Sequence, residues 1–313
     1  METVPNNNAK PKRSKLERRE SMIAFGFVSI KIVGFVLFTL IPVVACVLYS
    51  FSNMNPMAYP NSLVTYLGDR NFWAGFRQYV DLFTHPLYTQ IFLRSVLNTV
   101  VLMITVPLGM ACGMVLATIL TEKEIKFKAG FRLLIYLPVV ASAVAMGYIW
   151  RYVFETEYGI LNQIFGLNLN WFSNKHLVRL AIIVKNTWGS MGRTMILYIA
   201  GCLSISSSYY DAAEIDGASR WAKFWKITFP LLTPTTFYLL VMGIIGNLQS
   251  YNDSVIFAPG SQGAQTVVWF IWQYGINQNR YGLAAAASVL LSIVIMSLTI
   301  VQFKRSDKWV YSS

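Results

Sequence analysis

Long apolar runs alternate with short polar and basic segments along this chain. Apolar runs free of Asp, Glu, Lys and Arg occupy residues 32–68, of which 32–51 is continuously apolar, and residues 95–121, 133–150, 227–252 and 281–303. A hydrocarbon core about 30 Å thick needs roughly 20 mostly apolar helical residues to cross it. Each run therefore predicts a transmembrane helix, and the pattern as a whole predicts an all-α integral membrane protein.

A sixth span is predicted at residues 178–204, although Lys185 and Arg193 interrupt it. Cations inside a membrane usually face the interior of a helix bundle or a wet cavity. We therefore expect a transmembrane helix with one polar face, which brings the predicted number of crossings to six.

Composition agrees with this picture. Apolar residues make up 55% of the 313 positions and charged residues 13%, whereas soluble domains carry about a quarter charged residues. Cys46, Cys112 and Cys202 fall inside the predicted spans without the spacing of metal ligands, so we expect packing roles. The first 20 residues are too long and polar for a signal-peptide start, so we expect the first span to be retained.

The distribution of positive charge predicts the orientation. Of the 26 Lys and Arg residues, sixteen fall on one side of the six-span layout, seven on the other and three within the spans. Cytoplasmic loops carry the excess of Lys and Arg, which places both termini in the cytoplasm. The same distribution argues against nucleic acid as the partner, despite the net charge of +12. The run VVWFIWQYGI, with only about ten apolar residues, is then expected to be an interfacial or re-entrant helix outside.

The predicted layout has five parts. Aromatic and apolar residues interspersed with charge in FWAGFRQYVDLFTHPLYTQIFLRS favour an amphipathic helix on the outer surface, with a plain loop as the alternative. The parts are a basic cytoplasmic tail at 1–21, a first transmembrane helix at 22–51, an extracytoplasmic loop with the amphipathic helix at 52–94, a core of five transmembrane helices at 95–303 and a cytoplasmic end at 304–313.

Between the fourth and fifth spans, residues 209–232 form a polar segment, YYDAAEIDGASRWAKFWKITFPLL. The serines at 206–208 can cap a helix that begins near Tyr209, and Asp211 and Glu214 then lie near its positive dipole end. Gly217 can end that helix. The sequence thus predicts a short cytoplasmic helix over these residues.

A second short helix is expected after Gly217. Its apolar face would be opposed by a basic stripe, and Pro230 and Pro234 would mark the start of the fifth span. The two faces are Trp221, Phe224 and Trp225 against Arg220, Lys223 and Lys226. Such an elbow can press into a groove on a soluble partner or can merely anchor the loop at the membrane interface, and the pattern leaves both interpretations open.

This stretch resembles the EAA loop of membrane subunits of binding-protein-dependent ABC importers, in particular the carbohydrate-uptake group that includes the maltose and glycerol-3-phosphate permeases. In that pattern an acid and two alanines precede a glycine, and Ile-x-Leu-Pro closes the loop. Here these places hold Asp211, Ala212, Ala213, Gly217, Ile227 and Pro230, and Ile215, Asp216, Ala218, Trp221 and Phe224 match the sugar-group form. Asp211 in place of Glu and Phe229 in place of Leu depart from it. The resemblance covers roughly residues 72–310.

The resemblance implies the type I ABC importer permease fold with a cytoplasmic coupling helix, in a bacterial or archaeal plasma membrane. The implied partners are a second permease subunit, a dimer of cytosolic ATPase, an extracytoplasmic solute-binding protein, a carbohydrate substrate and membrane lipid. The chain itself would bind no cofactor, and ATP and Mg would be used by the ATPase. The implied ATPase-coupling residues are Asp211, Ala212, Ala213, Glu214, Asp216, Gly217 and Pro230.

The residues themselves predict no catalytic or metal site. Gly-Lys does not occur, so the phosphate cradle of an ATPase is missing, and His85 and His176 belong to no catalytic or zinc-binding motif. An ion-coupled secondary transporter is the alternative outside the family, yet no Asp or Glu lies mid-span and no internal repeat is visible. A membrane-embedded transferase or protease would need a reactive constellation, and none is visible. Within the family, glycerol-3-phosphate or another small polar solute is the alternative to a sugar.

Polar residues in the fourth and fifth spans are candidates for the substrate path, because sugar hydroxyls can bond to amides and sugar rings can stack on aromatics. Helix-to-helix hydrogen bonding is the alternative role. The resemblance favours Asn186 and Asn247, and Pro107 is expected to kink the second span. The full candidate set is Asn186, Trp188, Arg193, Asn247, Ser250, Tyr251 and Asn252.

Overall fold

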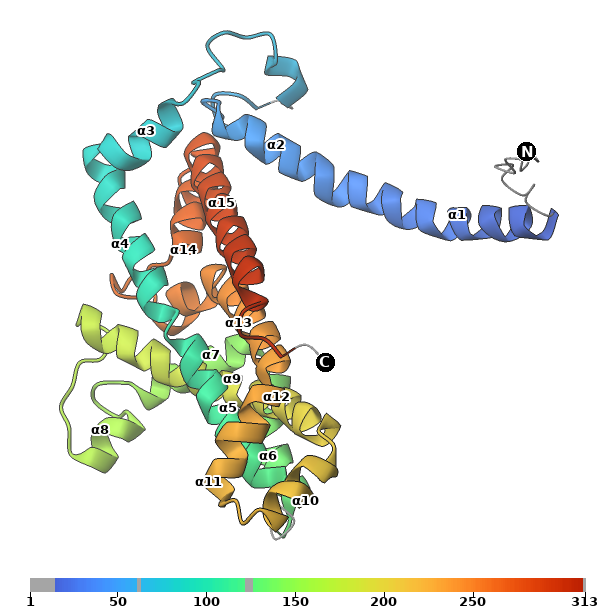
Figure 1. Cartoon of the computed structure of the whole chain (residues 1–313). Helices are drawn as coiled ribbons and strands as arrows, with labels where there is room; N and C mark the ends of the chain where they lie inside the picture. The colour runs from blue at the N-terminus through green and yellow to red at the C-terminus, as the bar shows by residue number, and fades with distance from the viewer. Residues whose placement is uncertain (1–14, 61–62, 122–125, 312–313) are drawn as a thin grey trace, which may run out of the picture.

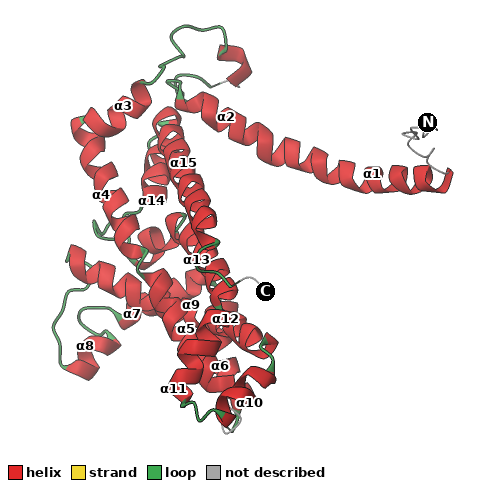
Figure 2. Cartoon of the chain, in the orientation of Figure 1, coloured by secondary structure: helices red, strands yellow, loops and turns green. Residues whose placement is uncertain are grey.

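The computed structural model describes residues 15–60, 63–121 and 126–311 and consists of helices joined by loops (Figures 1 and 2). The all-α prediction is therefore confirmed for these residues. A simple test of length and apolarity finds three helices among them that could cross a membrane, at Ile23–Ser50, Pro86–Thr121 and Tyr281–Ser306, or up to five if each of two bent pairs is one span. The sixth crossing stays a prediction.

The N-terminal part is a long helical arm, apolar from Ile23 to Ser50, that projects from the body of the molecule (Figure 1). It runs without interruption through α1 (Lys15–Phe35), the π-helical turn η1 (Val36–Leu40) and α2 (Ile41–Ser50). Most of its side chains from Ile23 to Val47 are exposed, and α2 packs against the C-terminal helix α15 (Tyr281–Ser306). The span predicted at 22–51 is thus a helix, which also takes in the described end of the tail predicted at 1–21.

The region after the arm differs from the prediction in the extent of the amphipathic helix and in the start of the second span. The short turn η2 (Leu63–Tyr66) is followed by α3 (Arg77–Thr84), the only part of the predicted amphipathic segment that forms a separate helix. The helix α4 (Pro86–Leu102) begins nine residues before the predicted start at 95, so the outer loop does not extend to 94. Proline suits the first turn of a helix, and the His85 side chain caps it by accepting from the Leu87 N–H at 3.3 Å. The predicted run begins after the charged residue Arg94, but an arginine can lie along a helix and remain partly exposed, so its charge does not mark the start of the helix.

The second span is broken between α4 and α5 (Thr105–Thr121). Pro107 lacks the N–H that would bond to the Met103 carbonyl, and the break falls at residues 103–104, one turn before it. This agrees with the kink expected from Pro107. It also leaves backbone carbonyls at the end of α4 available to other groups.

The third span, predicted at 133–150, is bent in the structure. Helix α6 (Lys128–Val140) and α7 (Ala143–Val153) meet at an angle of 101°. Ala141 is extended, with ψ 149°, and Ser142 precedes α7 as its N-cap residue. The apolar run continues through this bend, so a criterion based on charge alone could not detect it. The short α8 (Ile160–Phe165) follows.

Close packing joins α5 to α9 (Lys175–Ser204), which is 30 residues long. Gly109 and Gly113 form a Gly-x-x-x-Gly pair on α5, and a methyl group at either position would collide with Ser190 or Thr194 of α9. The Thr194 hydroxyl donates to the Gly109 carbonyl at 2.9 Å. Small residues let helix backbones approach closely and hydrogen bond in lipid, so this contact fixes the position of α9.

The elbow after α9 comprises α10 (Ser207–Ile215), α11 (Arg220–Lys223), η3 (Phe224–Thr228) and α12 (Phe229–Leu231). A bend of 62° separates this last run from α13 (Thr233–Leu248). The fifth span predicted at 227–252 is therefore too long at both ends, because its apolar residues before 232 belong to the elbow and those after 248 to a loop.

The chain then passes through η4 (Asp253–Phe257), α14 (Val267–Trp272) and η5 (Gln273–Asn277) to α15. Asn98 of α4 is fully buried and holds this region: its amide group donates to the carbonyls of Gln262 and Gln265, both at 2.8 Å. Its carbonyl oxygen accepts from Arg179 of α9. These bonds tie the loop after η4 to two helices of the body.

Candidate functional site

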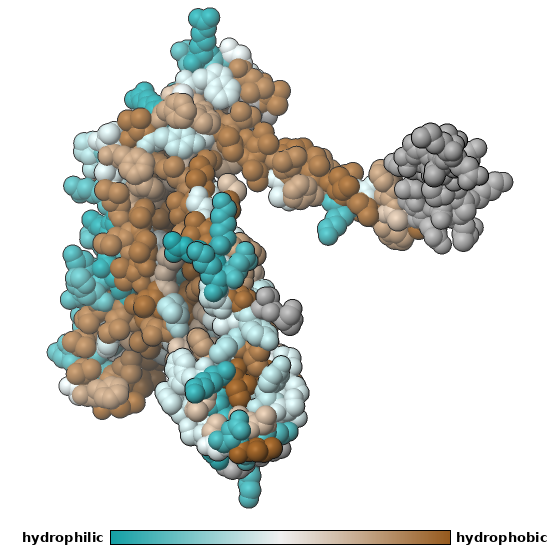
Figure 3. All heavy atoms as spheres, in the orientation of Figure 1, coloured by the Kyte–Doolittle hydropathy of each residue, from teal (hydrophilic) through white to brown (hydrophobic). Residues whose placement is uncertain are grey.

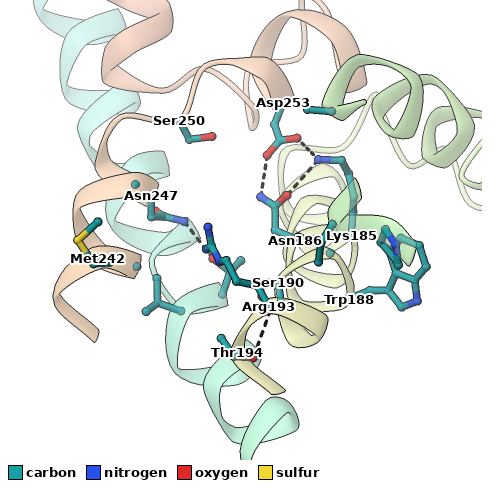
Figure 4. A pocket seen from close by; sticks show the side chains of 18 of the residues that line it. Lys185, Asn186, Trp188, Ser190, Arg193, Thr194, Met242, Asn247, Ser250 and Asp253 are labelled. Atoms are coloured by element: carbon teal, nitrogen blue, oxygen red, sulfur yellow. Dashed lines mark hydrogen bonds and ion pairs between the residues drawn. The ribbon is translucent and has the colours of Figure 1, made fainter. Parts of the chain in front are cut away.

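A cavity of ≈ 800 Å³ opens between α9 and α13, with α5, α6 and α7 contributing to its wall (Figure 4). Every residue that the sequence proposed for the substrate path lines this one cavity. Its lining also includes Lys185, Ser190, Gln249 and Asp253. The polar residues of two helices far apart in the sequence are thus brought together, whereas their contact with a substrate stays a prediction.

A buried ion pair lies at one end of the cavity. Asp253 is 4% exposed, and the two oxygens of its carboxylate accept from the Lys185 ammonium and from the Asn186 amide, the latter at 2.7 Å. Lys185 also donates to the Asn186 side-chain oxygen at 3.0 Å. The three side chains form a closed network between α9 and η4 (Figure 4).

The sequence pattern does not mark Asp253 as part of the site, because the residue follows the fifth apolar run and has no place in a predicted span. Lys185 is the residue that could have pointed to Asp253, because a cation inside a span needs a counter-charge. Asp253 is the first acid after the fifth apolar run. Asp253 lies in η4, five residues after the end of α13, so the expectation that no Asp or Glu lies in the middle of a span stays a prediction.

Asn247 holds α13 against the break between α4 and α5. Its amide group donates to the Leu102 carbonyl at 3.2 Å and to the Thr105 hydroxyl at 3.0 Å. Its own side-chain oxygen is buried without a partner in the described part of the chain. Asn186 and Asn247 thus both make hydrogen bonds between elements, which is the structural role that the sequence left open for them.

The aromatic residues divide between the two sides of the cavity. The Trp188 ring lies edge-on to Trp150 of α7, with centroids 5.4 Å apart, and the Tyr251 ring lies against Trp272 of α14 at 5.6 Å. The Ser250 carbonyl accepts from Thr266 at 2.7 Å. These contacts secure the rim of the cavity to α7 and α14.

Two polar side chains of the predicted set remain exposed, Asn252 and Arg193. In Figure 4 the Arg193 side chain extends from α9 across the cavity toward α13. Within the described residues, Arg193 has no hydrogen bond or ion pair, which makes it available to a ligand.

The elbow forms as the sequence predicted. Ser206 is the N-cap of α10 and accepts from the Ser208 N–H at 3.4 Å. Gly217 ends this helix with a φ of +71°, and the Ala218 N–H closes the turn on the Ala213 carbonyl at 2.9 Å. A left-handed residue after the last helical turn favours glycine because it has no Cβ.

Side-chain contacts hold the two arms of the elbow together. The hydroxyls of Tyr210 and Thr228 lie 3.0 Å apart, and Lys223 pairs with Glu214 at 3.5 Å. Burial raises the pKa of the Tyr210 phenol, with the Thr228 hydrogen bond opposing the shift. The phenol therefore stays protonated at neutral pH and can donate to Thr228.

The outer side of the elbow is exposed. Asp211, Ala212, Asp216 and Gly217 are all exposed, while Ala213 and Pro230 are half-buried. Ile215 and Trp221 are large apolar side chains that are 88% and 70% exposed. Figure 3 shows polar residues gathered around this end of the molecule, with apolar side chains among them. A surface of this kind suits contact with another protein.

Comparisons with known proteins agree on one class. The family model described as "Binding-protein-dependent transport system inner membrane component" matches residues 89–310. The arabinooligosaccharides transport system permease protein AraP of Bacillus subtilis is 30% identical over 290 residues, covering 89% of this chain and 86% of AraP. The sn-glycerol-3-phosphate transport system permease protein UgpA of Agrobacterium fabrum is 28% identical, covering 73% of this chain and 80% of UgpA.

A solved structure shares the fold. A chain of a bacterial ABC transporter involved in the import of the acidic polysaccharide alginate superposes with a TM-score of 0.79 over 94% of this chain and 99% of that chain, at 21% identity.

Proposed function

This chain belongs to the family of binding-protein-dependent transport system inner membrane components, as a permease of carbohydrate-uptake ABC importers, and we propose that it forms half of the path for a sugar or oligosaccharide. In this proposal the elbow at 205–232 couples the path to separate cytosolic ATPase subunits. A second permease subunit completes the path, and an extracytoplasmic binding protein delivers the solute.

The observation that carries the proposal is the connection between cavity and elbow. Helix α9 supplies Asn186, Trp188 and Arg193 to the cavity and runs without a break to Ser204, the residue directly before the elbow. Helix α13 supplies Asn247 and begins directly after the elbow. A displacement of the elbow is therefore applied to both walls of the cavity, which is the mechanical link that an ATP-driven change of access requires.

The elbow offers its partner both charge and apolar surface. Asp211 is exposed and has no hydrogen bond or ion pair within the described ranges, so its carboxylate is available to a cation on the ATPase. Ile215 and Trp221 of the same elbow are exposed apolar side chains that a groove can cover. The ties between Tyr210 and Thr228 and between Lys223 and Glu214 keep this surface in one shape.

The proposal is tested by ATP-dependent uptake of a panel of labelled trisaccharides, neutral and acidic, into proteoliposomes that hold the complete complex and its binding protein. Asp211→Lys brings like charges together at the proposed joint, so we expect uptake to fall at least about tenfold and less ATPase to co-purify. Asp307→Lys is the matched control, since Asp307 is an exposed acid beyond α15, outside the elbow.

Normal uptake by Asp211→Lys with the ATPase still bound would refute the coupling role. Uptake that persists without ATP and follows an ion gradient would instead support a secondary transporter. Uptake of glycerol-3-phosphate without any saccharide would place the chain with its UgpA-like relatives.

A further inference from the structure

The charge of the cavity narrows the class of substrate. Three charged side chains line it within the described residues, Lys185, Asp253 and Arg193. The first two neutralise each other, and both oxygens of the Asp253 carboxylate are already occupied. One positive charge, that of Arg193, is left without an acid in the wall.

The Arg193 guanidinium is also left without neutral partners. It carries five N–H donors, and the described structure gives none of them an acceptor, although amides and carbonyls lie on the facing helix. The side chain is exposed and extends into the cavity rather than along its own helix (Figure 4). A cation in a membrane-embedded cavity is costly unless it serves a ligand or a path.

An arginine side chain without hydrogen-bond or ion-pair partners favours binding of a planar anion. Its donors form a rigid fork that matches a carboxylate in a bidentate contact, which a compact ammonium cannot reproduce. Phosphate satisfies the same fork, but the cavity of ≈ 800 Å³ offers far more room than a glycerol phosphate fills.

The surroundings of Arg193 suit a saccharide. Across the cavity on α13, Tyr238 and Met242 are one turn apart and are 53% and 52% exposed, so they present an open apolar face to a sugar ring. Gly189 and Gly246 also line the cavity, and nothing lies within 4 Å of the position that a Cβ would take at either glycine. The wall thus combines the unpaired cation of Arg193, the exposed ring of Tyr238 and open space beside Gly189 and Gly246.

We propose that the substrate of this permease is an acidic oligosaccharide containing uronic acid, and that Arg193 binds its carboxylate. The proposal rests on the function proposed above and specifies its substrate class. Arg193 is then the residue that distinguishes acidic from neutral saccharides in this half of the path.

The test uses the complete complex in lipid nanodiscs without the solute-binding protein, so that only the permease cavity selects. Binding of labelled trigalacturonate, triglucuronate and trimannuronate is measured by equilibrium dialysis, each beside its methyl ester, which keeps the shape and removes the charge. We expect at least one acid to bind about tenfold more tightly than its ester, Arg193→Gln to abolish this ratio, and Arg193→Lys to keep part of it. Arg70→Gln, at an exposed position outside the cavity, is the control and should leave the ratio intact.

Equal binding of every acid and its ester to the parent complex would overturn the proposal, as would a preference that survives Arg193→Gln. If Arg193→Gln weakens acid and ester by the same factor, or prevents the two permeases from co-purifying, the arginine serves assembly and the proposal is wrong. Uptake of neutral saccharides in the proteoliposome assay would still uphold the permease function in each of these cases. Glycerol-3-phosphate that binds in an Arg193-dependent manner while no uronate does would assign the site to a phosphate.

Discussion

Removing the carboxylate of Asp253 should destabilise this permease, because it leaves the buried Lys185 ammonium without its counter-charge. Asp253→Ala leaves the Lys185 ammonium, whose side chain is 14% exposed, with the Asn186 oxygen at 3.0 Å and the face of the Phe257 ring at 5.7 Å. Neither replaces a full negative charge. The Asn186 amide loses its acceptor in the same step.

The expected magnitude follows from burial. Breaking a buried ion pair by removing one partner costs about 3–5 kcal/mol, and we expect about 3 kcal/mol because Lys185 borders the cavity, where water can reach it. With an unfolding entropy of about 2.1 cal/mol/K per residue, the 313 residues of this chain give about 0.66 kcal/mol/K, so that loss lowers the melting temperature by roughly 4–5 °C. The double variant Lys185→Met with Asp253→Leu should recover most of it, because no unpaired charge then remains.

The assay heats the detergent-solubilised complex in steps and measures the fraction that remains monodisperse by size-exclusion chromatography. Asp81→Asn is the matched control, because it breaks the exposed Arg77–Asp81 pair of 3.8 Å on α3, and surface pairs contribute at most about 1 kcal/mol. A melting temperature of Asp253→Ala equal to that of the control would refute the reasoning. The reasoning would also fail if the double variant lost as much stability as the single variants Lys185→Met and Asp253→Leu lose together.

Further variants address other parts of the structure. Asn247→Leu removes the bonds to Leu102 and Thr105, so we expect a loss of about 1 kcal/mol in stability and weaker transport with normal ATPase docking, and parent-level transport would show that Asn247 is not needed in the path. Gly113→Val collides with Thr194 and should lower the yield of folded protein, whereas Gly68→Val, where nothing lies within 4 Å, should not; equal yields would contradict the packing described for α5 and α9. A cysteine at Ser208 should resist an impermeant reagent outside intact cells, because the Lys and Arg distribution places the elbow inside, and labelling from outside would overturn that topology.

Much of the elbow was predictable because its determinants are local. The N-cap at Ser206 and the left-handed turn at Gly217 each depend on residues within one helical turn, and the structure has both where the sequence indicated them. The long helices follow from apolar length in the same way, and Pro107 indicated the break before α5.

The polar residues of the cavity were identifiable as a set, but their arrangement was not. The sequence marks Asn186, Arg193 and Asn247 as polar groups in apolar surroundings, without stating which of them are bonded to the protein. The structure shows that the amides of Asn186 and Asn247 hold other elements, whereas Arg193 stays free within the described ranges. That difference arises from packing between α9, α13 and the break after α4.

By itself the sequence determined that this chain is helical and apolar, that it carries an elbow of defined start and turn, and that two of its spans are polar. Only the tertiary structure decided the 101° bend between α6 and α7 and the meeting of Lys185 with Asp253, which are 68 positions apart. The physical reason is the range of the interactions. Helix caps, turns and apolar length are fixed by neighbours along the chain, whereas the partner of a buried charge and the direction of a broken helix depend on segments that only folding brings together.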